Sequence, residues 1–125
     1  MKKQTLTPGY YLSNARETLK TKAEKSGDLY GNVKYVQTAS GTAYLGVLVA
    51  IDGYLQRKEG AGFRKPKSIE EYRTRVGKYD RKLLGLLNTA YDELHILGYY
   101  HGTTSVRTIQ DGLGAAERII EYTTA

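Results

Sequence analysis

The clearest pattern in the chain is a stretch without charged residues, from Tyr35 to Ile51. Within it and just after it, small residues recur at gaps of four, three, four and three positions, at Ala39, Ala43, Gly46, Ala50 and Gly53. These gaps place the small residues on one face of a helix, where they let a neighbouring backbone come close. Bulky residues that fill the adjacent grooves stand at Tyr44, Val47, Leu48, Ile51 and Leu55. The pattern predicts the central helix of a helical bundle.

Start and stop signals define the helix that precedes it. Thr7 is a suitable N-cap and Pro8 a suitable first helical residue. Gly27 can adopt the left-handed conformation that ends a helix, and Asp28 can cap the one that follows. We therefore expect a first helix up to residues 26–28 and a second over about residues 29–58.

The second half of the chain predicts two more helices. Glycines and Pro66 mark residues 59–67 as a loop. Ser68 and Glu71 form a capping-box pattern, which begins a third helix that the apolar periodicity carries to about Tyr99. A fourth helix begins near Thr104. Its heptad-like apolar face consists of Val106, Ile109, Leu113, Ala116 and Ile120.

Short connections between these helices indicate the fold. Successive helices joined by short loops run antiparallel, so we expect an all-α, antiparallel up-down-up-down four-helix bundle with two long central helices, in one domain over residues 1–125. The long helices should project beyond the short ones at the end that holds the 59–67 loop. Apolar residues there, such as Ile51, Leu55 and Tyr72, would lack cover in a monomer. Either the loop folds back, the third helix bends at Gly77, or a second subunit supplies the cover; we expect a homodimer.

Composition excludes several classes of protein. The chain has no cysteine, so it has neither disulfides nor thiolate metal sites. The uncharged stretch is shorter than the roughly 20 residues of a membrane span, and no apolar stretch follows the two lysines at the N-terminus. We therefore expect a cytoplasmic protein with no membrane contact. Twelve tyrosines against one phenylalanine indicate many half-buried rings whose hydroxyls reach water.

Positive charge is concentrated around the 59–67 loop. Residues 57–82 contain ten basic and four acidic residues. The difference of +6 equals the formal net charge of the whole chain. Such a field attracts phosphate or acidic protein surfaces, and Phe63, Tyr72 and Tyr79 offer stacking surfaces nearby. The alternative is an ordinary solvated face. The candidate binding residues are Arg57, Arg64, Lys65, Lys67, Arg73, Arg75 and Lys78.

Candidate catalytic chemistry is sparse. Asp92 and His95 are three positions apart, as in a carboxylate-oriented base, but also as in a simple ion pair on a helix surface. No Glu-x-x-His pair indicates a carboxylate-bridged metal site. We expect no metal and no cofactor. The end of the third helix is rich in rings, which indicates either a seal over the end of the bundle or an aromatic pocket formed by Tyr30, Tyr99, Tyr100 and His101.

Two segments resemble HEPN-type helical bundles of bacteria and archaea. The opening helix reads YYLSNARETLKTKAE over Tyr10–Glu24, and the long helix carries GTAYLGVLVAIDGYL over Gly41–Leu55. The chain is also similar to small uncharacterised bacterial bundle proteins. The HEPN resemblance implies an often dimeric bundle, often paired with a nucleotidyltransferase. Its ribonuclease branch carries an arginine that is followed, after four to six residues, by a histidine, and neither His95 nor His101 has an arginine at that spacing. The resemblance thus implies the non-catalytic branch.

The function expected from the sequence is a non-enzymatic binding or interaction module. Its basic hairpin end would contact a nucleotide, a nucleic acid or an acidic protein partner. Two alternatives stay open: a ribonuclease-like or nucleotide-processing enzyme that uses Asp92, His95 and Tyr99, and a purely structural oligomer.

Overall fold

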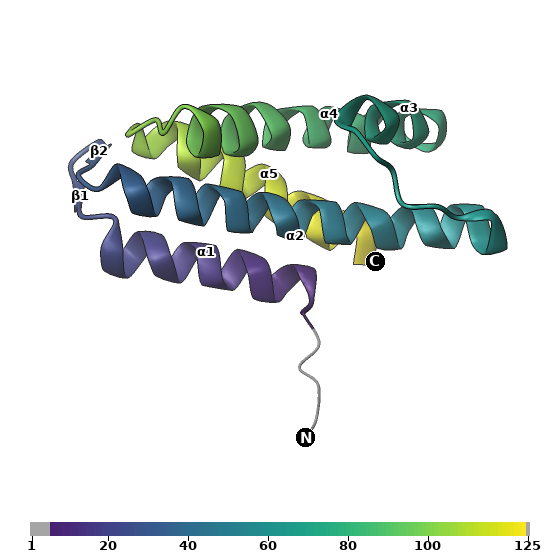
Figure 1. Ribbon diagram of the computed structural model, residues 1–125, viewed down its shortest axis with the longest axis horizontal. Helices are drawn as coiled ribbons and strands as arrows, with labels where there is room; N and C mark the ends of the chain where they lie inside the picture. The colour runs from purple at the N-terminus through teal and green to yellow at the C-terminus, as the bar shows by residue number, and fades with distance from the viewer. Residues whose placement is uncertain (1–5, 125) are drawn as a thin grey trace, which may run out of the picture.

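The computed structural model describes residues 6–124, and these residues are mostly helical. The helix α1 (Pro8–Lys22) packs beside the long helix α2 (Val33–Glu59), and the helix α5 (Val106–Thr124) contacts both. Two short helices, α3 (Ile69–Tyr79) and α4 (Arg81–Ala90), lead into the π-helix η2 (Tyr91–Tyr100), which runs back along α2 (Figure 1). The all-α prediction is confirmed. Residues 6–124, however, contain more helices than the four that we expected.

The small-residue face of α2 packs as predicted. Ala39, Ala43 and Gly46 are buried. A Cβ atom added at Gly46 would lie 2.9 Å from the Tyr11 Cβ and 3.0 Å from the Pro8 carbonyl oxygen, so the backbone of α1 approaches α2 closely at this point. The predicted cap of α1 is also present, because the Thr7 hydroxyl accepts a hydrogen bond from the Tyr10 amide at 3.1 Å.

The connection between α1 and α2 differs from the prediction. A two-stranded hairpin, β1 (Lys25–Ser26) and β2 (Leu29–Tyr30), occupies residues that we expected to end the first helix and begin the second. Gly27 has a positive φ of 60°, but it serves the hairpin turn rather than a helix end. Asp28 does not cap α2; its carbonyl oxygen accepts a hydrogen bond from the Val106 amide. Contacts with the chain around residue 105 thus hold these residues extended, and α2 begins only at Val33.

The prediction of one continuous third helix, from residue 69 to about Tyr99, is wrong. The chain is extended at Asp80, with φ −159° and ψ 110°, whereas Gly77 lies inside α3. Asp80 acts as the N-cap of α4, since its carboxylate accepts a hydrogen bond from the Leu83 amide at 3.0 Å. The Tyr122 hydroxyl donates to the same carboxylate from α5. The Asp80 carboxylate thus gives the Leu83 amide the acceptor that a carbonyl of an unbroken helix would provide.

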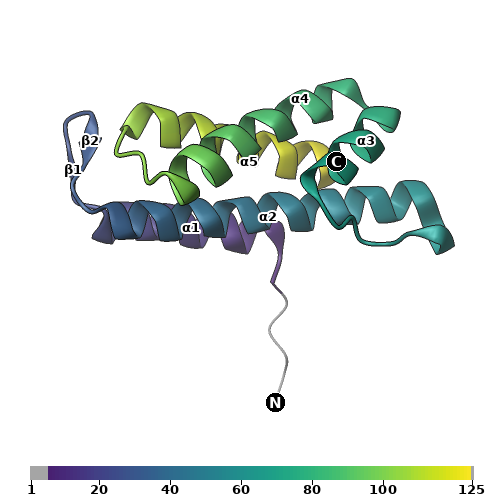
Figure 2. The ribbon, with the colours of Figure 1, turned by 45° about the horizontal axis from the view of Figure 1, so that its top comes forward.

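This break allows the chain to cover its own far end. After α2, a short 3₁₀ helix η1 (Gly60–Gly62) and an extended segment return the chain, and α3 lies alongside the end of α2 (Figure 2). Ile51 and Leu55 are fully buried, and Tyr72 is 4% exposed. The argument that these residues need a second subunit for cover is therefore wrong. Among residues 6–124, no helix combines the length and hydrophobicity that crossing a membrane requires.

Candidate functional site

The first candidate site is a hollow of about 710 Å³ at the end of α2, which we call the basic hollow. It is enclosed by the end of α2, the extended return segment and one side of α3. Six basic side chains line it: Lys58, Arg64, Lys65, Lys67, Arg75 and Lys78. The other lining residues are Glu59, Gly62, Glu71 and Tyr79.

The acids of the basic hollow are both engaged by Arg75. Its guanidinium lies 2.5 Å from a Glu59 carboxylate oxygen and 3.1 Å from one of Glu71. The side chains of Arg75 and Glu59 are each only 18% exposed. The hydrogen bond from Arg75 is the main cause that lowers the pKa of Glu59, and the Lys67 backbone amide is the main cause for Glu71. Both carboxylates thus stay ionised, and the single positive charge of Arg75 offsets one of their two negative charges.

The residues that line the hollow carry a net charge of +4, because six basic residues face two acids. Within residues 6–124, none of the five basic residues other than Arg75 takes part in an ion pair. Lys78 lies over the ring of Tyr79, 5.6 Å from its centroid, and Lys58 lies at the same distance from the Tyr54 centroid. Arg75 is 5.6 Å from the centroid of Phe63. Of these rings, Tyr79 lines the hollow, so positive charge and one ring surface occur together in it.

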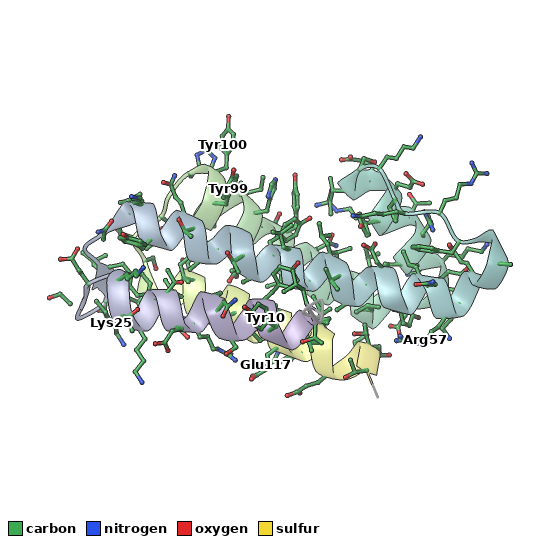
Figure 3. The ribbon with its side chains drawn as sticks, turned by 60° about the horizontal axis from the view of Figure 1, so that its bottom comes forward. Tyr10, Lys25, Arg57, Tyr99, Tyr100 and Glu117 are labelled. Carbon is green, nitrogen blue, oxygen red and sulfur yellow. The ribbon has the colours of Figure 1, made fainter. Side chains whose placement is uncertain are left out.

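Two of the candidate basic residues lie elsewhere. Arg57 points to the other side of α2, where it donates a hydrogen bond to the Thr123 carbonyl oxygen near the end of α5 (Figure 3). Arg73 donates to the Asn88 side chain at 2.9 Å and covers the ring of Tyr91 at 4.9 Å. The structure thus places Arg64, Lys65, Lys67, Arg75 and Lys78 at one hollow, adds Lys58, and removes Arg57 and Arg73.

The second candidate site is a row of rings along η2. Tyr91, His95 and Tyr99 follow one another every four residues, with centroid distances of 5.3 Å and 5.8 Å and interplanar angles of 28° and 11°. Tyr44 of α2 lies 4.9 Å from His95, and burial raises its pKa to about 12. The row lies on the π-helix η2, and π-helical turns are frequent at functional sites.

A second hollow, of about 470 Å³, lies between this row and the outer side of α2. We call it the α2 hollow. No lysine, arginine, aspartate or glutamate lines it. Gly41 is needed here, because an added Cβ would lie 2.9 Å from the ring of Tyr99. The lining residues are Thr38, Gly41, Thr42, Tyr44, Leu45, Leu48, His95 and Tyr99.

The four residues proposed as an aromatic pocket are not brought together. Tyr30 is 3% exposed, and its hydroxyl accepts a hydrogen bond from Gln110 at the other side of the hairpin. Tyr99 lines the α2 hollow, whereas Tyr100 is 71% exposed and contacts only the edge of His101 among the rings (Figure 3). The sequence signal that identifies the actual row was the i, i+4, i+8 spacing of Tyr91, His95 and Tyr99.

In the described part of the chain, few side chains are arranged as a catalytic or metal site requires. The hydrogen bonds of residues 6–124 include none between Asp92 and His95, and His95 is instead packed among tyrosine rings. Within the same residues, no group of three or more histidine, aspartate or glutamate side chains could hold a metal ion.

Comparison with known proteins identifies the family. The model of DUF5618, a domain of unknown function, matches residues 4–125. The chain belongs to the DUF5618 family. It is also similar to a solved protein of unknown function from Dyadobacter fermentans, with 31% sequence identity and a TM-score of 0.82. That match covers 93% of this chain and 88% of the other. No curated protein matches this DUF5618 chain.

Proposed function

We propose that this protein is a non-enzymatic cytoplasmic module that binds nucleic acid through the basic hollow. One observation carries the proposal: five cations line one hollow without an ion-pair partner among residues 6–124, while both acids of the hollow are bound by Arg75. Each cation that contacts a phosphate releases a counterion, which drives binding at moderate salt. The suggested relation to non-catalytic HEPN bundles belongs to this proposal and rests on the two quoted sequence segments.

Ring surfaces favour nucleic acid over an acidic protein surface. Tyr79 lines the hollow next to Lys78, and Phe63 lies beneath Arg75. Phosphates need cations, whereas exposed bases stack on rings, so a site that offers both is typical of nucleic-acid binding. No specific observation favours a ribonuclease-like or nucleotide-processing enzyme, because the ion pairs within the described residues include none between His95 and a carboxylate, and His95 packs against Tyr44.

The test is fluorescence anisotropy with a labelled single-stranded RNA of about 20 nucleotides and a duplex of equal length, over a range of salt concentrations. If all five cations contact phosphates of the single strand, log K should fall with log[salt] with a slope of about −3.5. The double variant Lys65→Glu/Lys67→Glu should weaken binding at least about tenfold at 100 mM salt and flatten that slope. Both side chains are exposed, so folding should be unaffected.

A matched control carries the same charge change at the opposite end of the molecule. Lys20→Glu/Lys25→Glu alters two exposed lysines near the hairpin, and it should leave most of the affinity intact. Equal losses in the two double variants would indicate unspecific attraction by net charge and remove the basic hollow from the proposal. Absence of RNA and DNA binding by the wild-type chain would overturn it altogether.

A further inference from the structure

The extended return segment, residues 63–67, carries much of the positive charge of the basic hollow. Three of the lining residues that have no ion pair among residues 6–124 lie on it, namely Arg64, Lys65 and Lys67, and all three are exposed. Cationic side chains on a loose segment lose more conformational entropy on binding than side chains on a fixed one. The contacts that hold this segment in place therefore influence binding at the hollow.

Arg75 contacts both ends of the return segment. At the beginning of the segment, its guanidinium lies over the ring of Phe63, 5.6 Å from the centroid. At the end, the Lys67 backbone amide donates a hydrogen bond to one Glu71 carboxylate oxygen at 2.8 Å, and Arg75 donates to the other at 3.1 Å. Pro66, between these two ends, is buried and has a fixed φ. We call the contacts of Lys67, Glu71 and Arg75 the Glu71 clamp.

Glu71 is a costly residue in a site that attracts phosphate. Its carboxylate lines the hollow with a side chain that is 40% exposed, so its negative charge opposes the positive field there. The hydrogen bond from the Lys67 amide is the main cause that lowers its pKa, so the carboxylate is charged at neutral pH. An acid that reduces attraction but joins the return segment to α3 indicates a role in geometry.

We propose that Glu71 is a positioning residue of the nucleic-acid site, because it holds the return segment against α3 with its three cations in a fixed arrangement. Glu59 supports it from the end of α2, since Glu59 binds Arg75 and keeps that guanidinium beside Glu71. This inference rests on the proposed function of the basic hollow. It adds that the arrangement of the cations, and not only their number, sets the affinity for nucleic acid.

The first test separates geometry from charge in the same RNA-binding measurement. Glu71→Ala removes a negative charge, so charge alone would tighten binding, whereas loss of the clamp should weaken it at least about fivefold. Glu70→Ala is the matched control with the same charge change one residue earlier. The Glu70 side chain is 77% exposed and pairs only loosely with Arg73, at 3.9 Å. Glu70→Ala should bind RNA as tightly as the wild type or more tightly. Wild-type or tighter binding by Glu71→Ala overturns the proposal.

Two further variants keep the proposal testable if Glu71→Ala is poorly folded. Glu71→Gln has the charge of Glu71→Ala but keeps a carbonyl oxygen that can accept from the Lys67 amide, so it should bind RNA more tightly than Glu71→Ala. Arg75→Lys keeps the net charge but lacks the planar fork that reaches both carboxylates, so it should bind RNA at least about threefold more weakly than the wild type. Wild-type affinity of Arg75→Lys, or equal affinities of the two Glu71 variants, contradicts a positioning role.

Amide hydrogen exchange without RNA shows whether the variants act on the return segment. The Lys67 amide should exchange at least about tenfold faster in Glu71→Ala than in the wild type, and at the wild-type rate in Glu70→Ala. The amide of Leu113, which is fully buried on α5, should exchange equally slowly in all three proteins and so report an intact core. Faster exchange at Lys67 with unchanged RNA affinity overturns the positioning role but leaves nucleic-acid binding intact. A wild-type chain that binds neither RNA nor DNA removes both proposals.

Discussion

The middle and the C-terminal end of α2 belong to one continuous helix, yet they are stabilised in different ways. The middle, residues 35–51, has no charge and lies against α1 through small residues such as Gly46. Three of the four charged residues of the end, residues 52–59, meet a polar partner: Asp52 accepts from Tyr72, Arg57 donates to Thr123, and Glu59 binds Arg75. Close packing depends on shape, whereas polar contacts depend on protonation, so the two regions should respond to different perturbations.

The largest expected difference between the two regions concerns their glycines. Gly46→Ala forces α1 away from α2, because the new Cβ would meet the Tyr11 Cβ at 2.9 Å, and we expect a loss of about 2 kcal/mol. Gly53→Ala in the end region meets only the Arg57 side chain at 3.5 Å, and the gain in helix propensity should add about 0.5 kcal/mol. Urea unfolding measures both. Equal effects would show that α1 and α2 are not closely packed at Gly46.

A smaller effect is expected where the end region meets α3. The Tyr72 hydroxyl donates a hydrogen bond to an Asp52 carboxylate oxygen at 2.6 Å, and the tyrosine is buried. Tyr72→Phe should lower the free energy of unfolding by about 1.5 kcal/mol, since a hydrogen bond to a charged group is lost. Tyr10→Phe, at an exposed position of α1, is the control and should change stability by less than about 0.5 kcal/mol. Similar losses of unfolding free energy in both variants would show that the hydrogen bond between Tyr72 and Asp52 does not cause the effect of Tyr72→Phe.

Acid should weaken the end region selectively. The pKa values of Glu59 and Glu71 lie below their ordinary 4.5 in the folded chain, so their contribution is fully present above about pH 4.5 and is lost as the pH falls through the folded-state pKa. Melting temperatures of the wild type should fall on acidification, and Arg75→Met should show a shallower fall because it lacks the main partner of Glu59. Parallel curves for the two proteins would contradict this assignment.

Alkali should weaken the middle region, with the smallest effect of the set. Burial raises the pKa of Tyr44 from 10.0 to about 12, so its contribution is complete below pH 10 and is lost as the pH rises toward 12. A spectrophotometric titration should show one fewer late-ionising tyrosine in Tyr44→Phe than in the wild type. The melting temperature of this variant should also decline less steeply above pH 10. An unchanged titration would place the Tyr44 hydroxyl in contact with water.

Local patterns in the sequence predicted much of the fold. The periodicity of small residues identified the buried face of α2, and Thr7 and Ser68 correctly marked the beginnings of α1 and α3. These features depend on residues within one or two helical turns. The break at Asp80 was missed because the apolar periodicity continues across it, and one of the contacts that hold it comes from Tyr122, which is 42 residues away.

The candidate sites show the same difference between features that nearby residues determine and features that distant contacts determine. Sequence located the positive charge around the 59–67 loop, because charge is a property of composition. It did not show that Arg75 binds both Glu59 and Glu71, nor that Arg73 turns toward Tyr91. Side chains on neighbouring turns of one helix point in different directions, and the surrounding elements decide which of them face a common hollow.

The sequence by itself determined that the chain is helical, where its long central helix packs, and where its net charge lies, because periodicity, capping and composition act over short distances. Only the tertiary structure decided that the far end covers itself, which cations share the basic hollow, and that the outer side of α2 is left open between η2 and solvent. These features depend on segments far apart in the chain that meet only when it folds, and no local pattern specifies which of them will meet.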